Sequence, residues 1–225
     1  MEITWEDRFK GIGAFWKHDG NPKRPYARLT SGKISNGFFN GEIVAKHAKI
    51  FGEACEALAA KATVFSLRDS RFEHFVVGPA MGAIKLSGRI AESFDFFAAY
   101  AERGEEGLFV FKRTAPGETA RVALCEDTIT TGGSLRDLRA TIKNICPKGD
   151  VALEILALCN RSKNASAYGD EATIPGHRII ALVNRNDMPI WEEGNNPFTP
   201  DGRELVPPVR PKGIDNWFAL TRMYD

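Results

Sequence analysis

Short apolar segments alternate along most of the chain with segments in which apolar residues recur every three to four positions. The first pattern predicts buried strands and the second predicts helices with one buried face. This alternation predicts an α/β fold, with a central, mainly parallel sheet and helices on both faces. The expected strands are 63–67, 75–77, 95–102, 108–112, 122–124, 151–158 and 178–183, and the expected helices are 1–20, 42–60, 84–90 and 135–145.

Residues 121–134 read RVALCEDTITTGGS and combine a strand, two acids, a glycine-rich turn and the start of a helix. The glycines allow backbone N–H groups to point at one place, and a helix N-terminus adds positive potential there. The turn therefore predicts a phosphate site. It is not the nucleotide loop G-x-x-x-x-G-K-[ST], because no lysine follows the glycines. Glu126 and Asp127 beside it suit a sugar phosphate, whose hydroxyls would donate to the acids directly or through a hydrated metal ion.

Residues 74–92 repeat this architecture, with small residues between Gly78 and Gly82 that allow close approach of an anion. A different chemistry is expected near the N-terminus. There, the polar turn from Thr30 to Ser35 precedes Phe38 and Phe39. Hydroxyl groups beside flat apolar surface suit a planar heteroaromatic ring, and a simple β-turn is the alternative.

Composition narrows the class of protein. The chain has 225 residues, 43% of them hydrophobic and 26% charged, which favours one globular domain with appendages. A formal net charge of +1 argues against bulk nucleic-acid binding. The four cysteines have no C-x-x-C or metal-ligand spacing and are expected to be core residues in a reducing compartment. We expect neither a signal peptide nor a membrane span, hence a cytoplasmic protein without membrane partners.

The sequence CEDTITTGGS closely resembles the signature by which type I phosphoribosyltransferases bind phosphoribosyl pyrophosphate (PRPP). The pattern L-x-S-G-x-x-S followed by aromatics is similar to the base-binding segment of orotate phosphoribosyltransferases, although Thr30 stands where many members have lysine. The resemblance spans about 29–183. It implies the type I phosphoribosyltransferase fold over 1–183, with an N-terminal helix and hood at about 1–42 and a proline-rich extension at 184–225.

This resemblance implies Mg2+-dependent transfer of the phosphoribosyl group from PRPP to orotate, giving orotidine 5′-monophosphate and pyrophosphate. It also implies a homodimer in which a mobile loop reaches the neighbouring site. The alternatives are a purine phosphoribosyltransferase, a non-catalytic PRPP-sensing regulator, and a homologue that has lost activity or changed its base. A regulator would need a nucleic-acid-binding module or face, which the sequence does not show.

The resemblance also assigns roles to individual residues. It implies Glu126, Asp127 and Arg103 as catalytic residues, with Mg2+ held near the two acids through PRPP and water rather than directly by the protein. The expected PRPP-binding residues are Ala80, Met81, Gly82, Lys112, Arg113, Thr128, Thr130, Thr131, Gly132, Gly133 and Ser134. The expected orotate-binding residues are Ser31, Gly32, Phe39, Thr130 and Arg161.

Several of these assignments have alternatives. Lys112 and Arg113 equally suit a solvated charged hairpin, and the loop lacks the R-K…K-x-H-G pattern of the best-known branch. Arg161 follows Asn160 instead of the usual aspartate and could be a surface arginine.

The resemblance also predicts a non-proline cis peptide, at Ala80–Met81. In the extension, six of the twelve prolines fall within 189–211 together with several aromatics, which predicts loops and short hairpins wrapped on the domain. No cysteine follows Cys159, so a zinc site there is not expected.

Overall fold

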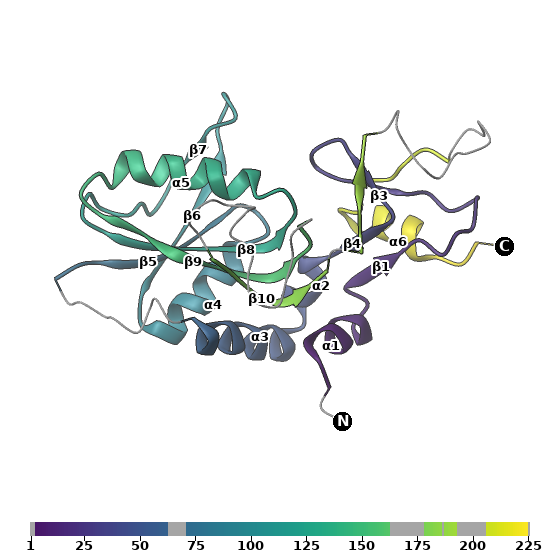
Figure 1. The fold of residues 1–225 in the computed structure, drawn as a ribbon, viewed down its shortest axis with the longest axis horizontal. Helices are drawn as coiled ribbons and strands as arrows, with labels where there is room; N and C mark the ends of the chain where they lie inside the picture. Colours follow the sequence, from purple (N-terminus) through teal and green to yellow (C-terminus); the bar gives the residue numbers. More distant parts are fainter. Residues whose placement is uncertain (1–2, 63–70, 163–177, 186, 193–205, 225) are drawn as a thin grey trace.

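A computed structural model describes residues 3–62, 71–162, 178–185, 187–192 and 206–224. The predicted strand at 63–67 lies outside these residues. The described chain forms a larger lobe around a central sheet and a smaller lobe beside it, named here the sheet lobe and the small lobe (Figure 1).

The central sheet has the strand order β10-β9-β8-β5-β6-β7. Its first five strands pair in parallel, and β7 runs antiparallel to β6 as the second arm of a hairpin. The predicted α/β class and mainly parallel sheet are therefore confirmed. The strands are β5 (His74–Pro79), β6 (Phe97–Arg103), β7 (Phe109–Val110), β8 (Arg121–Ile129), β9 (Asp150–Asn160) and β10 (Arg178–Asn184).

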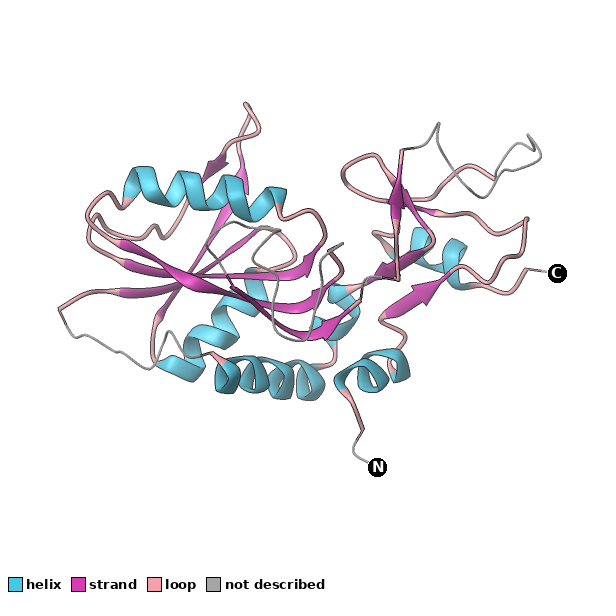
Figure 2. Cartoon of the chain, viewed as in Figure 1, coloured by secondary structure: helices cyan, strands magenta, loops and turns pink. Residues whose placement is uncertain are grey.

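Helices cover both faces of this sheet (Figure 2). One face carries α3 (Ala48–Lys61) and α4 (Ile84–Phe94), and the other carries α5 (Gly133–Ile145). Each helix contributes the apolar residues that its three-to-four spacing predicts, such as Leu58 in α3, Ile90 in α4 and Leu138 in α5, all fully buried. The two resulting cores lie on opposite faces of the sheet and hold it in place.

Several expected elements have other bounds in the structure. The helix predicted for 1–20 ends early: α1 spans Trp5–Gly11, Gly13 has a φ of +73°, and Phe15–Lys17 form strand β1. The helix predicted for 42–60 is two helices, α2 (Gly41–Lys46) and α3, with a break at His47. Strand β8 is longer than expected, because its pairing with β9 continues to Ile129. The two adjacent acids therefore belong to the strand and not to the turn after it.

The small lobe is assembled from both ends of the chain. Strand β1 pairs with β4 (Gly37–Phe39), and a three-stranded sheet has the order β11-β3-β2, where β11 is Ile190–Trp191, β3 is Ile34–Ser35 and β2 is Ala27–Arg28. Pairing of β11 with β3 joins the extension to the hood. The extension also forms a helix, α6 (Ile214–Thr221), where only loops and hairpins were expected. The helix has only eight residues, so its apolar members gave little periodic signal.

Side-chain contacts fix the extension to the hood. The indole N–H of Trp16 donates to the Leu220 carbonyl at 3.0 Å, and Arg24 donates to the same oxygen at 2.6 Å. The rings of Phe38 and Trp217 lie 6.0 Å apart. The extension therefore packs on the hood, while the division of the chain at residue 183 stays a prediction.

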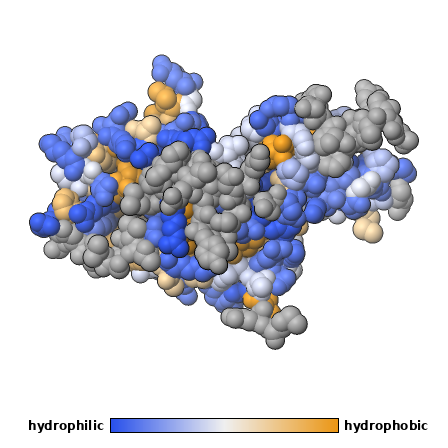
Figure 3. All heavy atoms as spheres, viewed as in Figure 1, coloured by the Kyte–Doolittle hydropathy of each residue, from blue (hydrophilic) through white to orange (hydrophobic). Residues whose placement is uncertain are grey.

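Most of the visible surface is hydrophilic, and the projecting β6–β7 hairpin has a hydrophilic tip with apolar surface below it (Figure 3). There, Leu108 and Val110 are exposed, and Phe97 is exposed at the start of β6. Among the described residues, no helix is both long enough and apolar enough to cross a membrane.

Candidate functional site

The sheet brings the two glycine-rich turns together. Strands β5 and β8 are parallel neighbours, so the turns that follow them lie at the same edge of the sheet. This edge faces the small lobe (Figure 2). Ligands of open α/β sheets bind at the carboxyl ends of such strands. The predicted PRPP-binding turns thus share one side of the molecule with the predicted base-binding hood.

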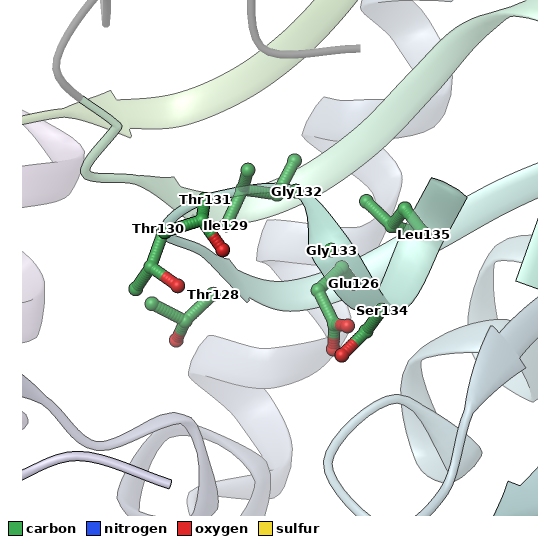
Figure 4. Close-up of a pocket in the computed structure, with 9 residues that line it drawn as sticks. All are labelled: Glu126, Thr128, Ile129, Thr130, Thr131, Gly132, Gly133, Ser134 and Leu135. Carbon is green, nitrogen blue, oxygen red and sulfur yellow. The ribbon is translucent and has the colours of Figure 1, made fainter. Parts of the chain in front are cut away.

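The end of β8, the turn after it and the first residues of α5 form the phosphate loop, Thr128 to Leu135. It surrounds a cavity of about 50 Å3, which is also lined by Glu126 (Figure 4). Gly132 is the N-cap of α5 and has a φ of +69°, a backbone conformation that suits glycine. Helix α5 therefore begins at the loop and directs its free backbone N–H groups and positive end toward the cavity. The structure places all the predicted residues of this loop around one cavity.

Asp127 connects the phosphate loop strand to two other segments. A Cβ atom added to Gly82 would lie 2.6 Å from a carboxylate oxygen of Asp127, and one added to Gly41 would lie at the same distance. Only glycine leaves room for the carboxylate at these two positions. The sequence singled out Gly82 but not Gly41, which follows the helix N-cap Asn40 without any local glycine signal. The peptide between Ala80 and Met81 is cis, as predicted.

Glu126 is buried, with 9% of its surface exposed, and lines the phosphate-loop cavity. Burial raises the pKa of its carboxyl group well above the usual range, and the neighbouring charge of Asp127 raises the pKa further. Its Oε1 accepts a hydrogen bond from the Asp127 backbone N–H at 3.1 Å. A positive charge, Lys212 of the extension, acts in the opposite direction and lowers the pKa. The two adjacent acids thus have different surroundings: Glu126 is buried at the phosphate-loop cavity, whereas Asp127 lies beside Gly41 and Gly82.

The hood supplies only part of its predicted base site. Ser31 and Gly32 form an exposed turn, in which Gly32 has a φ of +84°. Phe39, by contrast, is 1% exposed, and its ring packs against Phe9 and Phe15 with centroid distances of 5.6 and 4.8 Å. The expected stacking surface at Phe39 is therefore wrong for this structure, because alternation along β4 turns this ring into the core.

Arg161 is not the surface residue of the alternative interpretation. It is 3% exposed, and its guanidinium donates to Ser35 Oγ at 2.8 Å and to the Met188 carbonyl at 3.0 Å. Burial lowers its pKa to about 10. Its buried Nε has no hydrogen-bond partner among the described residues. The arginine thus connects the end of β9 to both parts of the small lobe, which sequence spacing alone did not indicate.

Two cations in and beside the β6–β7 hairpin, Arg103 and Lys112, have partners outside the cavity. Arg103 pairs with Asp137 of α5 at 2.8 Å, and its guanidinium lies 4.1 Å from the ring centroid of Phe109. Lys112 pairs with Glu102 at 3.1 Å, and Arg113 is exposed. The structure does not bring these three predicted residues into the group formed by Glu126, Asp127, Gly82 and the phosphate loop.

The predicted core positions of the cysteines are confirmed. All four are buried and unpaired. Burial raises the pKa of the Cys125 thiol well above its usual value. In the part of the chain that the structure describes, no three histidine, cysteine, aspartate or glutamate side chains are grouped as a metal site.

Comparison with solved structures identifies the fold. The structure of orotate phosphoribosyltransferase from Aeropyrum pernix superposes with a TM-score of 0.54 at 20% identity and covers 78% of this chain and 90% of that one. Adenine phosphoribosyltransferase from Saccharomyces cerevisiae superposes with a TM-score of 0.54 at 13% identity, covering 79% and 98%. The predicted phosphoribosyltransferase fold is therefore confirmed.

Sequence comparison identifies the family. No family model matches the chain. The orotate phosphoribosyltransferase of Desulforamulus reducens is 29% identical over 186 residues, which cover 80% of this chain and 89% of that protein. The orotate phosphoribosyltransferase of Pelotomaculum thermopropionicum is 30% identical over 197 residues, covering 86% and 97%. At this identity over nearly the whole relative, the chain belongs to the orotate phosphoribosyltransferase family.

Proposed function

We propose that this protein transfers the phosphoribosyl group of PRPP to orotate, producing orotidine 5′-monophosphate and pyrophosphate. The observation that carries this proposal is the phosphate loop at the start of α5 with two adjacent acids in the strand that leads into it. A phosphate loop without a lysine, next to acids that suit ribose hydroxyls, fits a sugar phosphate better than a nucleoside triphosphate.

In this reaction, the bond from the anomeric carbon of ribose to pyrophosphate breaks, and the leaving group keeps the electron pair. The ring nitrogen of orotate forms the new bond to that carbon, and its N–H bond breaks, with the proton passing to the departing pyrophosphate or to water. The carbon becomes cation-like between the two events, so the protein contributes positioning and charge stabilisation rather than a covalent intermediate. Asp127 and Glu126 are suited to accept from the ribose hydroxyls and to favour the developing positive charge.

The phosphate loop is suited to bind the 5′-phosphate of PRPP. Backbone N–H groups at the α5 N-terminus would donate to the phosphate oxygens, together with the hydroxyls of Thr128, Thr130, Thr131 and Ser134. The turn at 80–82 lies beside Asp127 and is suited to the pyrophosphate group, which small residues allow to approach closely. The Ser31–Gly32 turn and the unpartnered Nε of Arg161 are the proposed base-side groups.

The residues present also fit a divalent cation. Two adjacent carboxylates supply hard oxygen ligands, and Mg2+ is usually held by one or two carboxylates together with waters and substrate phosphates. When bound, Mg2+ supplies charge neutralisation for the departing pyrophosphate. Glu126 and Asp127 would hold it, directly or through water.

We further propose a cytoplasmic homodimer. The four buried, unpaired thiols suit a reducing compartment. Exposed Leu108 and Val110 place apolar surface on the β6–β7 hairpin, where a second copy could pack and receive Arg103. Light scattering after size-exclusion chromatography should give twice the mass of the 24.9 kDa chain. A monomer at micromolar concentration would contradict this assembly.

The first experiment is turnover with PRPP and Mg2+ against orotate, uracil, adenine, hypoxanthine and guanine, followed by pyrophosphate release. Release with orotate alone is expected. Release with a purine would keep the phosphate-loop assignment and overturn the base. No release with any base, despite tight PRPP binding, would favour the PRPP-sensing regulator or a homologue that has lost activity or changed its base.

Two substitutions then separate the site into its parts. Asp127→Asn should lower kcat by about 100-fold or more, because a neutral amide cannot favour the developing positive charge. Arg161→Ala should raise the KM for orotate by about tenfold. Because Arg161 also holds Ser35 and Met188, the PRPP dissociation constant is the control and should change less than about threefold. Unchanged orotate use in Arg161→Ala would show that the base side is assigned incorrectly.

A further inference from the structure

The hood and the extension meet at the side chain of Ser35. Strand β11 of the extension pairs with β3 of the hood, and Ile190 lies opposite Ser35 in this pair. The Ser35 side chain is fully buried, and its hydroxyl donates to the Pro189 carbonyl at 2.8 Å. A hydroxyl has a single proton, so this bond leaves Ser35 Oγ only its lone pairs for other partners. The extension therefore makes Ser35 an acceptor.

Arg161 is the charged group that uses this acceptor. Its Nη2 donates to Ser35 Oγ at 2.8 Å and to the Met188 carbonyl at 3.0 Å, so both protons of that nitrogen are used. Both acceptors are neutral, and within the described chain Arg161 forms no ion pair. The hood and the extension thus hold a buried guanidinium without cancelling its charge.

The backbone of Arg161 is fixed to the phosphate loop. Its N–H donates to the Ile129 carbonyl at 2.9 Å, and Ile129 lines the phosphate-loop cavity. The side-chain Nε of Arg161 is buried and has no hydrogen-bond partner among the described residues. Buried donors are nearly always paired, so this N–H is a donor that a bound base can satisfy. Arg161 thus begins beside the phosphate loop and ends between the hood and the extension, with one donor left for a ligand.

The packing around these bonds is tight. Met188 is buried, and a Cβ atom added to Gly37 of β4 would lie 2.5 Å from Met188 Cγ. The backbone N–H of Gly37 also donates to Ser35 Oγ at 3.3 Å. One position beyond the β11–β3 pair, Lys33 forms an ion pair with Glu192 at 2.6 Å. The Met188 carbonyl therefore has little freedom to move away from the guanidinium.

We propose that Ser35 is a positioning residue for base binding, which acts together with the Met188 and Pro189 carbonyls of the extension by fixing the Arg161 guanidinium in the orientation that binds orotate. This inference rests on the proposed function. A binding group works best when its rotamer is locked by neighbouring hydrogen bonds and packing. The extension thereby contributes to orotate affinity through Arg161, without contacting the base itself.

The first test compares Ser35→Ala with the wild type. Steady-state kinetics at saturating PRPP give kcat and the KM for orotate, and calorimetric titration gives the dissociation constant for PRPP with Mg2+. Loss of the acceptor should raise the KM for orotate by about fivefold. The kcat value and the PRPP dissociation constant should each change by less than about twofold. A serine with a purely structural role would not discriminate between the two substrates.

Ser87→Ala is the matched control. Ser87 is also buried, and its hydroxyl donates to the Ile84 carbonyl at 2.9 Å within α4. Removal of this hydroxyl should leave the KM for orotate unchanged within about twofold. An equal rise of this KM in both serine variants would overturn the inference, as would an unchanged KM in Ser35→Ala.

A double-mutant cycle shows whether Ser35 acts through Arg161. In the Arg161→Ala background, Ser35 has no guanidinium to position, so adding Ser35→Ala should change the KM for orotate by less than about twofold. A further fivefold rise in the double variant would mean that Ser35 acts independently of Arg161, and the inference would be wrong.

Gly37→Ala tests the extension side and remains available if Ser35→Ala does not fold. The new methyl group would displace Met188, so the KM for orotate should rise by about fivefold while PRPP binding stays the same. Gly11→Ala is its control, because a Cβ atom added to Gly11 in α1 would meet nothing within 4 Å. An unchanged KM for orotate in a folded Gly37→Ala variant would contradict the role of the extension.

The two proposals can fail separately. If the wild type turns over orotate and Ser35→Ala does so with the same KM, the function stands and the role of Ser35 is wrong. If the wild type uses a different base and the double-mutant cycle shows coupling for that base, the proposed function fails and the positioning role stands. A wild type that uses no base would overturn both.

Discussion

The two lobes of this protein are built in opposite ways. The sheet lobe is a series of strand–turn–helix units, each contiguous in sequence, such as β8 followed by the phosphate loop and α5. The small lobe joins residues from the two ends of the chain: Trp16 and Leu220, which share a hydrogen bond, are 204 positions apart. The phosphate side of the site is therefore specified by local sequence, and the proposed base side is specified by long-range packing.

The lobes meet at a few side chains whose positions depend on both. Asp127 of β8 contacts Gly41 at the start of α2 and Gly82 in the turn after β5. Arg161 after β9 holds Ser35 of the hood and Met188 of the extension. The phosphate side and the proposed base side of the site are thus specified separately but meet at these residues. Substitutions at this junction should therefore have larger effects on activity than substitutions within either lobe.

The largest effect is expected at Gly82. In Gly82→Ala the new methyl group would lie 2.6 Å from a carboxylate oxygen of Asp127, so the carboxylate must move. A displacement of about 1 Å in a reacting group can cost about 100-fold in rate. We therefore expect kcat/KM to fall by about 100-fold, measured with PRPP and orotate. Full activity would show that Gly82 does not fix the position of Asp127.

Gly88→Ala is the matched control for this substitution. Gly88 lies within α4, and a Cβ atom added there would meet nothing within 4 Å. Alanine in a helix interior is more favourable than glycine by about 0.5–1 kcal/mol, so this variant should be slightly more stable than the wild type. Its kcat/KM should be unchanged. Equal loss of activity in both variants would trace the effect to general damage of the sheet lobe.

The second prediction concerns the buried Glu126. Burial raises the pKa of Glu126 in the folded protein above its value in the unfolded chain. Below the unfolded pKa the carboxyl group is protonated in both states and does not change the free energy of unfolding. As pH rises above that value, the unfolded chain loses the proton first, so the folded state is destabilised. Glu126→Gln removes this cost. Its unfolding temperature should exceed that of the wild type by about 2–4 °C at pH 8, and the difference should narrow toward pH 5. Calorimetry across this range is the measurement, and a difference independent of pH would show that the carboxyl group is not destabilised by burial.

The difference between the lobes explains what sequence could predict. The five parallel strands β5, β6, β8, β9 and β10, the phosphate loop and the adjacent acids all rest on local periodicity and local turn chemistry, and the structure has them. Sequence periodicity failed where contacts are long-range. Strand β1 was taken for helix because the Phe15 and Trp16 spacing suits either element, and pairing with β4 decides between them. Helix α6 likewise depends on distant residues, since its Leu220 carbonyl accepts from Trp16 and Arg24. The Met188 carbonyl accepts from Arg161, which is also distant in sequence.

Site residues divide along the same line. Glu126, Asp127 and the phosphate loop follow from one contiguous motif, and their side chains surround one region in the structure. Phe39 was expected to be a stacking surface because two adjacent aromatics look equivalent in sequence. Alternation along a strand sends them to opposite faces, and Phe39 lies in the core. Gly41 carries no motif at all, since its importance comes only from the approach of Asp127.

A smaller effect is expected within the small lobe. Trp16→Phe keeps an aromatic ring but removes the N–H that donates to the Leu220 carbonyl, which still accepts from Arg24. Loss of one such bond should lower the free energy of unfolding by about 1 kcal/mol. Hydrogen exchange should rise in α6 and β1 more than in β8. The comparison variant, Ile142→Val, removes one buried methyl group from α5 and should leave exchange in α6 unchanged. Equal changes in both lobes would show that they unfold as one unit.

The smallest effect tests whether the hairpin belongs to the site. Asp137→Ala removes the ion pair that holds Arg103 against α5; both side chains are about half exposed, so stability should change by no more than about 0.5 kcal/mol. If Arg103 assists pyrophosphate departure without help from α5, loss of the ion pair should leave the KM for PRPP unchanged or lower it by at most about threefold, because the Phe109 ring still holds the guanidinium in place. Glu118→Ala, which breaks the exposed pair with Lys148, is the control and should not change this KM. A higher KM in Asp137→Ala alone would mean that α5 positions Arg103 for the substrate, and the hairpin would then join the part of the site that local sequence does not specify.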